Sequence, residues 1–273
     1  MFIDIWCRVK KVVIFDSGVG GLSVYQEIRA RLPQAQYIYA FDNAAFPYGE
    51  LPQQVLIERA CHIITNLVAR HQADLVVVAC NTASTIVLPA LRQQLTIPVV
   101  GVVPAIKPAA QASLSKSIGL LATPATVERP YTHDLVKQFA QDCQVLMLGT
   151  TRLVEMAEEK LQGEVVSLNE LTQILAPWLG KVDTIVLGCT HFPLMRAEIQ
   201  QVCGAGVTII DSGKAIANRV VSLLPESATQ DAALEEMDNL TYCSAKPTRL
   251  DALNKSLQEM KLSAIQCLNY PYF

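Results

Sequence analysis

The sequence lacks the features that assign many proteins to a class at once. Its 273 residues carry a formal net charge of −3, so there is no electrostatic case for binding nucleic acid or an anionic membrane. No apolar run approaches the roughly 20 residues of a membrane span. The first residues, MFIDIWCRVKK, make a poor secretory signal, because the basic residues come after the short apolar stretch instead of preceding it. We therefore expect a cytoplasmic protein with no membrane or nucleic-acid partner.

Cysteine is too sparse for a disulfide scaffold, and its spacing does not fit a zinc ribbon. The chain has eight cysteines, and no two of them form a Cys-x-x-Cys pair. Free thiols in a reducing cytoplasm are the natural interpretation, and most free cysteines are small buried hydrophobes. We expect that bland role for six of the eight: Cys7, Cys61, Cys143, Cys203, Cys243 and Cys267.

Nucleotide-binding motifs are absent or incomplete. No G-x-x-x-x-G-K-[ST] occurs, so an ATP site has no motif. Gly18 and Gly20 begin a dinucleotide-type G-x-G-x-x-G, but Ser23 occupies its third position. Asp42 lies near the place of the ribose-binding acid, so a dinucleotide site stays an alternative. A tight strand-to-helix turn whose backbone N–H groups receive a carboxylate is the favoured interpretation.

What the sequence does contain is an alternation of apolar strands and amphipathic helices. With 51% hydrophobic residues, the chain can form a substantial core. Continuous β-branched runs predict buried parallel strands at 11–15, 37–41, 75–79, 98–102, 118–122, 145–149, 184–188 and 207–210. Helical patterns lie at 53–71, 84–95, 126–141, 152–161, 193–203 and 212–224. This alternation predicts an α/β fold with mainly parallel sheets, and the end of the chain reads as strand, helix and strand closing one sheet edge.

The strand ends also recur with consistent spacing, which predicts two similar halves. The matched positions are Asp16 with Thr123, Asp42 with Gly149, and Cys80 with Cys189. The proline-containing segment 102–110 is a plausible crossing between the halves. Open α/β sheets bind ligands at the carboxyl ends of their strands. Two facing halves would therefore place the two thiols on opposite walls of one cleft.

Both cysteines of this pair differ from core cysteines in having polar residues directly after them. Cys80 ends an apolar strand and precedes Asn81 and Thr82, while Cys189 ends another and precedes Thr190 and His191. A thiol near a helix N-terminus has a lowered pKa, and a histidine can lower it further or move a proton.

Several chemistries could use such thiols. A Cys-His hydrolase needs only one of them, and zinc could take Cys80, Cys189 and His191 as three ligands. In the favoured alternative, one thiolate removes a proton from a carbon while the opposite thiol donates one from the other face. The product is then the mirror image. Each sulfur would lie about 3–3.5 Å from that carbon, so the two sulfurs would be too far apart for a disulfide.

Five segments closely resemble motifs of the bacterial glutamate racemases, within the cofactor-independent aspartate/glutamate racemase family. They are FDSGVGGLSV, FDNAAFPYGE, VVACNTAST, GVVPAIKPA and VLGCTHFPL. The resemblance implies two three-layer α/β domains related by pseudo-twofold symmetry, with the active site in the cleft between them. The first domain would comprise residues 1–103 plus 214–273, and the second residues 104–213. It further implies interconversion of L- and D-glutamate without cofactor or metal, by a homodimer that supplies D-glutamate for peptidoglycan and thus for cell wall and cell shape.

The resemblance also assigns roles to residues. Cys80 would be the base toward D-glutamate, assisted by Asp16, and Cys189 the base toward L-glutamate, assisted by His191. Glu158 aligns loosely with a further assisting carboxylate, because two other glutamates lie close to it. The implied substrate-binding positions are Asp16, Ser17, Tyr48, Gly49, Asn81, Thr82, Thr126, Thr190 and His191. The residues ahead of the first strand resemble extensions in the branch of the family that needs a UDP-linked muramoyl precursor as activator.

Two rival functions remain open. One is a racemase for aspartate or another acidic amino acid on a similar fold. The other is an amino-acid-binding module without catalysis, whose cysteines are incidental; the second thiol argues against it.

Overall fold

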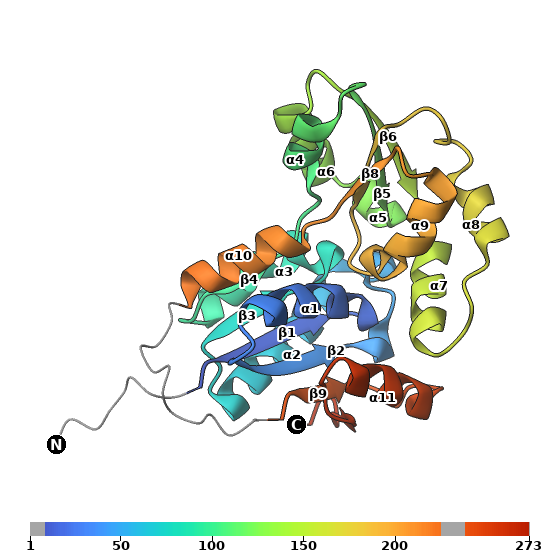
Figure 1. Cartoon of the computed structure of the whole chain (residues 1–273). Helices are drawn as coiled ribbons and strands as arrows, with labels where there is room; N and C mark the ends of the chain where they lie inside the picture. The colour runs from blue at the N-terminus through green and yellow to red at the C-terminus, as the bar shows by residue number, and fades with distance from the viewer. Residues whose placement is uncertain (1–8, 225–237, 273) are drawn as a thin grey trace.

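Residues 9–224 and 238–272 are described by the computed structural model of the chain, which has two lobes (Figure 1). Each lobe is built around one sheet, and in both sheets every neighbouring pair of strands is parallel. The two-part α/β architecture expected from the sequence is therefore confirmed. Cys7 and nearly all of the N-terminal extension lie outside the described residues.

The first lobe contains a six-stranded sheet of order β10-β9-β2-β1-β3-β4. Its strands are β1 (Lys11–Asp16), β2 (Gln36–Phe41), β3 (Leu75–Val78), β4 (Val99–Gly101), β9 (Leu240–Cys243) and β10 (Ile265–Cys267). The last two strands come from the end of the chain and flank α11 (Leu250–Glu259) in sequence. The predicted strand-helix-strand ending thus closes one edge of this sheet.

The second lobe contains a four-stranded sheet of order β6-β5-β7-β8. Its strands are β5 (Ser117–Ala122), β6 (Gln144–Gly149), β7 (Thr184–Leu187) and β8 (Thr208–Ile210). This order repeats β2-β1-β3-β4 of the first lobe, so the internal duplication expected from the spacing is present. The domain boundaries expected after residues 103 and 213 stay a prediction.

The register of the repeat differs by one residue from the predicted one. The N–H of Asp42 donates to the carbonyl of Asp16 over 3.0 Å, and that of Thr150 donates to the carbonyl of Ala122 over 3.0 Å. Asp16 therefore corresponds to Ala122, and not to Thr123. The difference arises because the sequence pattern aligns polar residues, whereas the hydrogen-bond ladder aligns backbone positions.

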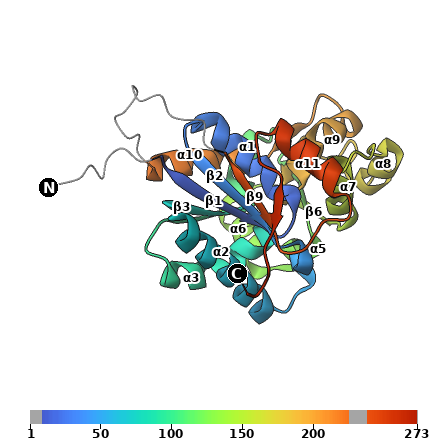
Figure 2. The same ribbon diagram turned by 90° about the horizontal axis from the view of Figure 1, so that it is seen from below.

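Helices cover both faces of each sheet. Those of the first lobe are α1 (Leu22–Arg31), α2 (Gln53–His71), α3 (Asn81–Gln94), α10 (Gly213–Leu223) and α11. Those of the second are α4 (Ile106–Ala112), α5 (Pro124–Glu128), α6 (Pro130–Phe139), α7 (Arg152–Leu161), α8 (Leu168–Leu175) and α9 (Arg196–Cys203). Figure 2 shows α1 and α10 on one side of the first sheet and α2 and α3 on the other. In the second lobe α7, α8 and α9 pack on one face of the sheet and α4 and α6 on the other, so each lobe is three-layered.

Some helices differ from the sequence expectation. The predicted helix 126–141 is divided into α5 and α6, because Arg129 precedes Pro130 and is extended, with φ −70° and ψ 135°. The patterns do not predict α4, which contains Pro108, or α8.

No helix among residues 9–224 and 238–272 is long and apolar enough to cross a membrane. Of the cysteines expected to be buried, Cys267 is exposed, and Cys143 and Cys203 are only partly buried.

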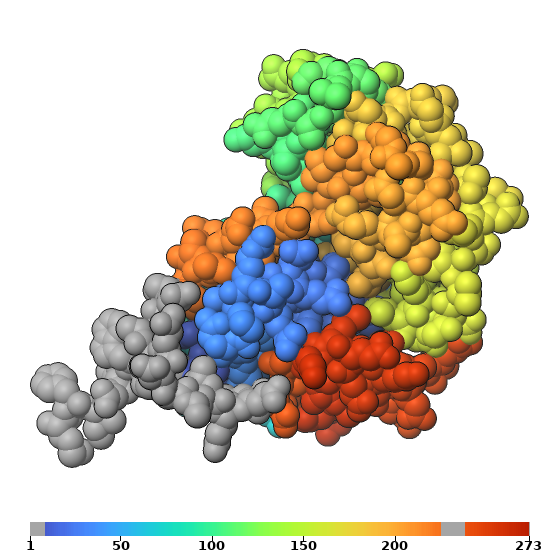
Figure 3. All heavy atoms as spheres, in the orientation of Figure 1, coloured from blue at the N-terminus to red at the C-terminus, as the bar shows by residue number. Residues whose placement is uncertain are grey.

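The two lobes also touch away from the sheets, through α7 and α11. The Ser256 hydroxyl on α11 donates to the carbonyl of Leu161, the last residue of α7, over 2.7 Å. In the space-filling view, α11 (red) lies directly against α7 (yellow-green) (Figure 3). Helix α7 also carries Glu158, one of the predicted catalytic residues. This contact therefore helps to position that residue.

Candidate active site

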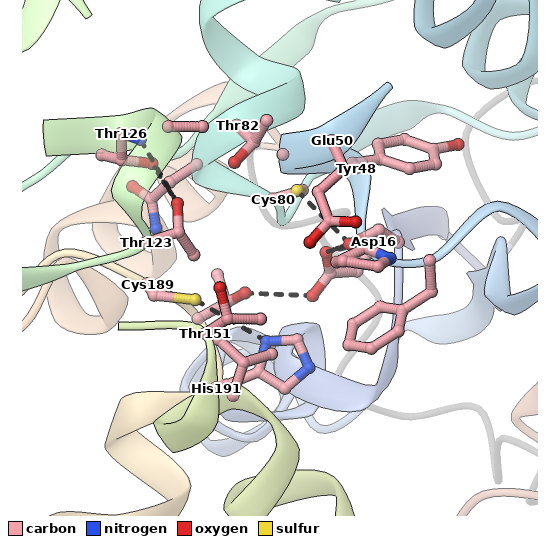
Figure 4. Close-up of a pocket in the computed structure, with 18 of the residues that line it drawn as sticks. Asp16, Tyr48, Glu50, Cys80, Thr82, Thr123, Thr126, Thr151, Cys189 and His191 are labelled. Carbon is pink, nitrogen blue, oxygen red and sulfur yellow. Dashed lines mark hydrogen bonds between the residues drawn. The ribbon is translucent and has the colours of Figure 1, made fainter. Parts of the chain in front are cut away.

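A pocket of about 130 Å³ lies where the carboxyl ends of both sheets meet (Figure 4). The first lobe lines it with Asp16, Ser17, Phe46, Pro47, Tyr48, Gly49, Glu50, Cys80, Asn81 and Thr82. The second lobe lines it with Thr123, Pro124, Ala125, Thr126, Thr151, Val154, Cys189, Thr190 and His191. Both thiols of the predicted pair thus reach one pocket from different lobes.

Cys80 is the N-cap residue of α3, with extended backbone (φ −129°, ψ 119°) after the buried strand β3. Its side chain is 6% exposed, and the Ser17 hydroxyl lies 3.7 Å from its Sγ. The lowered pKa expected for a thiol at a helix N-terminus is wrong for Cys80: burial raises its pKa well above the ordinary value, and the nearby Asp16 carboxylate raises it further. The resting form of Cys80 is therefore the thiol, which is the form that can donate a proton.

Asp16 ends β1 and is fully buried. Its Oδ1 accepts the N–H of Ser17 over 2.6 Å, and its Oδ2 accepts the hydroxyl of Thr190 over 3.0 Å. Burial raises the pKa of the Asp16 carboxyl, although the charge of His191 and these hydrogen bonds act in the opposite direction. Because Thr190 belongs to the second lobe, Asp16 joins the two halves beside the first thiol.

Cys189 has its own partner chain in the second lobe. Its Sγ lies 3.7 Å from Nδ1 of His191, and Nε2 of His191 lies 2.8 Å from Oε1 of Glu158. The same Oε1 accepts the N–H of Val19 over 2.9 Å, at the glycine-rich turn of the first lobe. The predicted turn thus receives a carboxylate on its backbone, and that carboxylate is Glu158.

The ionisation of His191 is set by these contacts. Burial alone lowers the pKa of His191, but the hydrogen bonds and charges of Cys189 and Glu158 raise it, so that it lies well above its ordinary value. His191 is therefore an imidazolium at neutral pH. His191 therefore places a positive charge at Nδ1, 3.7 Å from the Sγ of Cys189.

We expect Glu158→Gln to move the pH profile of racemisation. Removing the carboxylate lowers the pKa of His191, so the imidazolium is lost at a lower pH than in the wild type. The basic limb of kcat should shift to lower pH, with kcat at pH 8 reduced about tenfold. The check is kcat from pH 6 to 9, by circular dichroism of the amino acid.

Glu155→Gln is the matched control for this variant. Glu155 lies on the same helix but pairs with Arg152 at the surface, over 3.1 Å. A profile of Glu158→Gln that overlays those of the wild type and Glu155→Gln would contradict the role given to Glu158.

The structure brings nearly all the predicted site residues together. Every predicted catalytic and binding position lines the pocket except Glu158, which lies behind His191. Tyr48 lines it too, and its hydroxyl donates its proton to Asp42 over 2.7 Å. Asp42 also accepts two hydrogen bonds from Arg59 and does not line this pocket, so the dinucleotide alternative loses its ribose-binding acid.

Several lining residues are not assigned by the sequence motifs. They are Phe46, Pro47, Glu50, Pro124, Ala125, Thr151 and Val154. Phe46, Pro47 and Glu50 stand within the motif FDNAAFPYGE, so their place in a strand-end loop is a usable signal. Thr151 and Val154 lie at the start of α7, where the pattern predicts a helix but no ligand-facing side.

Among the described residues, no three His, Cys, Asp or Glu side chains are grouped so as to hold a metal ion, which leaves the zinc alternative without geometric support.

The comparisons with known proteins agree with this geometry. The profile of the family described as Asp/Glu/Hydantoin racemase matches residues 20–220. A glutamate racemase of Aliivibrio fischeri is 59% identical over 264 residues, covering 97% of this chain and 99% of the relative. One of Vibrio cholerae is 56% identical and covers 96% of this chain and 97% of the relative. The solved structure of Escherichia coli glutamate racemase in complex with L-glutamate and the activator UDP-MurNAc-Ala superposes with a TM-score of 0.88, at 49% identity, over 96% of this chain and 98% of that one.

The fold and the paired thiols therefore define an amino-acid racemase. The chain belongs to the Asp/Glu/Hydantoin racemase family, and its high-identity relatives within that family are glutamate racemases.

Proposed function

We propose that this chain interconverts L- and D-glutamate by proton transfer between two thiols. The observation that carries the proposal is that Cys80 and Cys189 line one pocket from opposite lobes, each with its own ionisable partners. A single nucleophile would leave the second thiol without a role. A binding module without catalysis would not need a buried imidazolium beside one thiol and a buried carboxyl beside the other.

The positions of the two sulfurs on opposite walls of the pocket determine the course of the reaction. The Cys189 thiolate, beside protonated His191, takes the α-proton of L-glutamate, and the Cys80 thiol gives a proton to the opposite face. The D enantiomer forms, and the reverse reaction exchanges the roles of the sulfurs. Another turnover in the same direction requires Cys189 to lose its new proton to solvent and Cys80 to regain one, and Asp16, next to Cys80, is our candidate to relay that proton to the sulfur. The negative charge that develops on the substrate is stabilised by neutral donors fixed in the pocket, since the protein's own groups must supply this stabilisation.

The pocket offers partners for the two ends of glutamate. Thr123 and Thr126 form one wall, with their hydroxyl oxygens 2.9 Å apart, and suit a carboxylate. Asp16 is our candidate acceptor for the substrate ammonium. Thr190 is less suited to bind a carboxylate, because its hydroxyl already donates to Asp16. Asn81 carries a buried Oδ1 with no hydrogen-bond partner among the described residues, so its amide is free to turn toward a ligand.

We expect the pocket to select glutamate over related amino acids. Each donor left empty by a ligand costs about 1–3 kcal/mol, so alanine should react very poorly. Glutamine should react poorly too, because its amide N–H₂ would face donors. Aspartate keeps every charge but is one methylene short, which misplaces its α-carbon between the sulfurs and lowers turnover as well as affinity. The measurement is kcat/KM for the four amino acids. A kcat/KM for aspartate equal to or above that for glutamate would favour the rival aspartate racemase, and no turnover at all would favour the binding module.

Our proposal extends to an activator and to the cellular setting. The E. coli relative was solved with UDP-MurNAc-Ala, described as its activator, and the same compound is our candidate activator here. We therefore expect it to raise kcat/KM for glutamate when it is added to the same assays. Supply of D-glutamate for peptidoglycan, a cytoplasmic homodimer and independence from cofactors are further parts of the proposal, which the resemblance of the sequence motifs supports.

A further inference from the structure

A buried cluster behind the pocket has no part in the proton transfer. It joins the end of β2, the loop after that strand, α2 and the end of the chain through Asp42, Tyr48, Arg59 and Tyr270. Asp42 and Tyr48 are 0% and 1% exposed, and the Arg59 side chain is 17% exposed. Such a desolvated cluster is costly unless its polar atoms are all paired.

The carboxylate of Asp42 is fully engaged. Its Oδ2 accepts Nε–H of Arg59 and the hydroxyl of Tyr48, both over 2.7 Å, and its Oδ1 accepts an Nη2 proton of Arg59 over 2.7 Å. Two parallel bonds between a guanidinium and a carboxylate fix direction as well as distance. The Tyr48 hydroxyl is therefore held at a defined point at the end of β2.

This point matters because Tyr48 belongs to the wall of the pocket. The residues from Phe46 to Glu50, which we call the substrate-facing loop, all line it. They include the short 3₁₀ helix Tyr48–Glu50, and a Cβ added at Gly49 would lie 3.4 Å from the Cβ of Ala125 in the second lobe. No other side chain of the substrate-facing loop has a hydrogen bond to the first lobe among those of the described residues, so the Tyr48 hydroxyl is its polar tether.

Arg59 in turn is covered by the C-terminal segment. Its guanidinium carbon lies 4.1 Å from the ring centroid of Tyr270, and the rings of Tyr270 and His62 are nearly perpendicular at a centroid distance of 5.4 Å. A cation over an aromatic face is stabilised most where water is excluded. Tyr270 therefore covers a face of the guanidinium whose Nε and Nη2 protons bond Asp42.

From these contacts we propose that Arg59 is a positioning residue for the substrate-facing loop, and that Tyr270 holds Arg59 in place. The C-terminal segment then sets the shape of the pocket wall without touching the substrate. The kinetic test of this inference rests on the proposed function, because it measures KM for glutamate. The position of the substrate-facing loop can also be tested without that function.

The test uses variants that change geometry more than charge. Arg59→Lys keeps the cation but cannot make two parallel bonds, and Tyr48→Phe removes only the tether. Tyr270→Phe keeps the ring over Arg59, whereas Tyr270→Leu keeps an apolar side chain without the aromatic face. We expect Arg59→Lys, Tyr48→Phe and Tyr270→Leu to raise KM for glutamate about tenfold with a smaller change in kcat, and Tyr270→Phe to resemble the wild type.

Arg70→Met is the matched control. Arg70 lies on the same helix and covers the ring of Tyr242 at 5.5 Å, but it has no link to Asp42. Equal rises in KM for Arg70→Met and Tyr270→Leu would overturn the proposal, because general loosening of α2 would then explain both. So would an unchanged KM in Tyr270→Leu and Tyr48→Phe.

A second readout does not need the enzyme to act on glutamate. Alkylation of Cys80 by iodoacetamide, with detection by mass spectrometry, reports access through the substrate-facing loop. We expect faster labelling of Cys80 in Arg59→Lys and Tyr270→Leu than in the wild type, Tyr270→Phe and Arg70→Met. Faster labelling in a protein that fails to racemise glutamate would refute the proposed function and keep this inference. Equal labelling in all variants would refute the inference alone.

Discussion

Racemisation of glutamate should be lost when alanine replaces either Cys80 or Cys189. Each face of the α-carbon then lacks its only proton carrier, and general acid–base groups contribute about 10²–10⁴-fold each. We expect kcat to fall at least about 10³-fold in both variants, with the melting temperature close to that of the wild type, since both side chains are small. Cys80→Ser should fare nearly as badly, because a hydroxyl is a far weaker acid than a thiol of ordinary pKa ~8.5.

The two alanine variants should differ in one respect that identifies the face each sulfur serves. In D₂O, Cys80→Ala keeps the base for L-glutamate and should exchange the α-proton of that enantiomer without inverting it. Cys189→Ala should exchange the α-proton of D-glutamate instead. Proton NMR of each enantiomer measures this directly. Cys203→Ala, at a partly buried cysteine outside the pocket, is the control and should racemise normally.

Two outcomes would contradict the two-base mechanism. One is rapid racemisation by either alanine variant. The other is exchange of both enantiomers by one variant, because a single remaining sulfur lies on one face only. A thermodynamic constraint applies to every variant that keeps some activity. The enantiomers have equal free energy in water, so kcat/KM must fall by the same factor for L-glutamate and for D-glutamate. Only kcat and KM taken separately can differ between the two directions.

The features that the sequence predicts correctly depend on local chemistry. A buried parallel strand needs a continuous apolar run, so LVVVA and TIVLG indicate β3 and β7 without knowledge of the fold. The polar residues directly after these runs must lie at strand ends, which is where α/β sheets bind ligands. That reasoning alone brings Cys80, Cys189 and His191 into one pocket.

The details that it leaves open depend on contacts between distant segments. Glu158 can be chosen over its neighbours only when α7 is placed against the glycine-rich turn, where Val19 and His191 share its Oε1. The motif resemblance makes Tyr48 a substrate-binding residue, yet its hydroxyl lies with Asp42, because the direction of a loop side chain depends on what packs behind it. Neither the packing of α7 against the first lobe nor the direction of the Tyr48 side chain produces a periodic pattern in the sequence.

Gly20→Ala should reduce kcat for glutamate about 10²-fold although Gly20 neither titrates nor lines the pocket. A Cβ at this position would lie 2.4 Å from Nδ1 and 2.7 Å from the backbone nitrogen of His191. Because one of these atoms is backbone, rotation of the imidazole alone cannot relieve the clash. His191 must move as a residue, which disturbs its 2.8 Å contact with Glu158 and its 3.7 Å contact with Cys189.

The control for Gly20→Ala is Gly206→Ala, where a Cβ would meet no atom within 4 Å. That variant should keep wild-type kcat.

A double-mutant cycle separates displacement of His191 from general damage to the turn. In the background of His191→Ala, which has already lost the imidazolium, Gly20→Ala should cost little further activity, because the group that the new methyl displaces is gone. If the losses instead multiplied, so that Gly20→Ala cost about 10²-fold in both backgrounds, the methyl would be acting on the glycine-rich turn and not through His191. The expected non-additivity therefore tests whether this turn of the first lobe holds the imidazolium of the second lobe in register with its thiol.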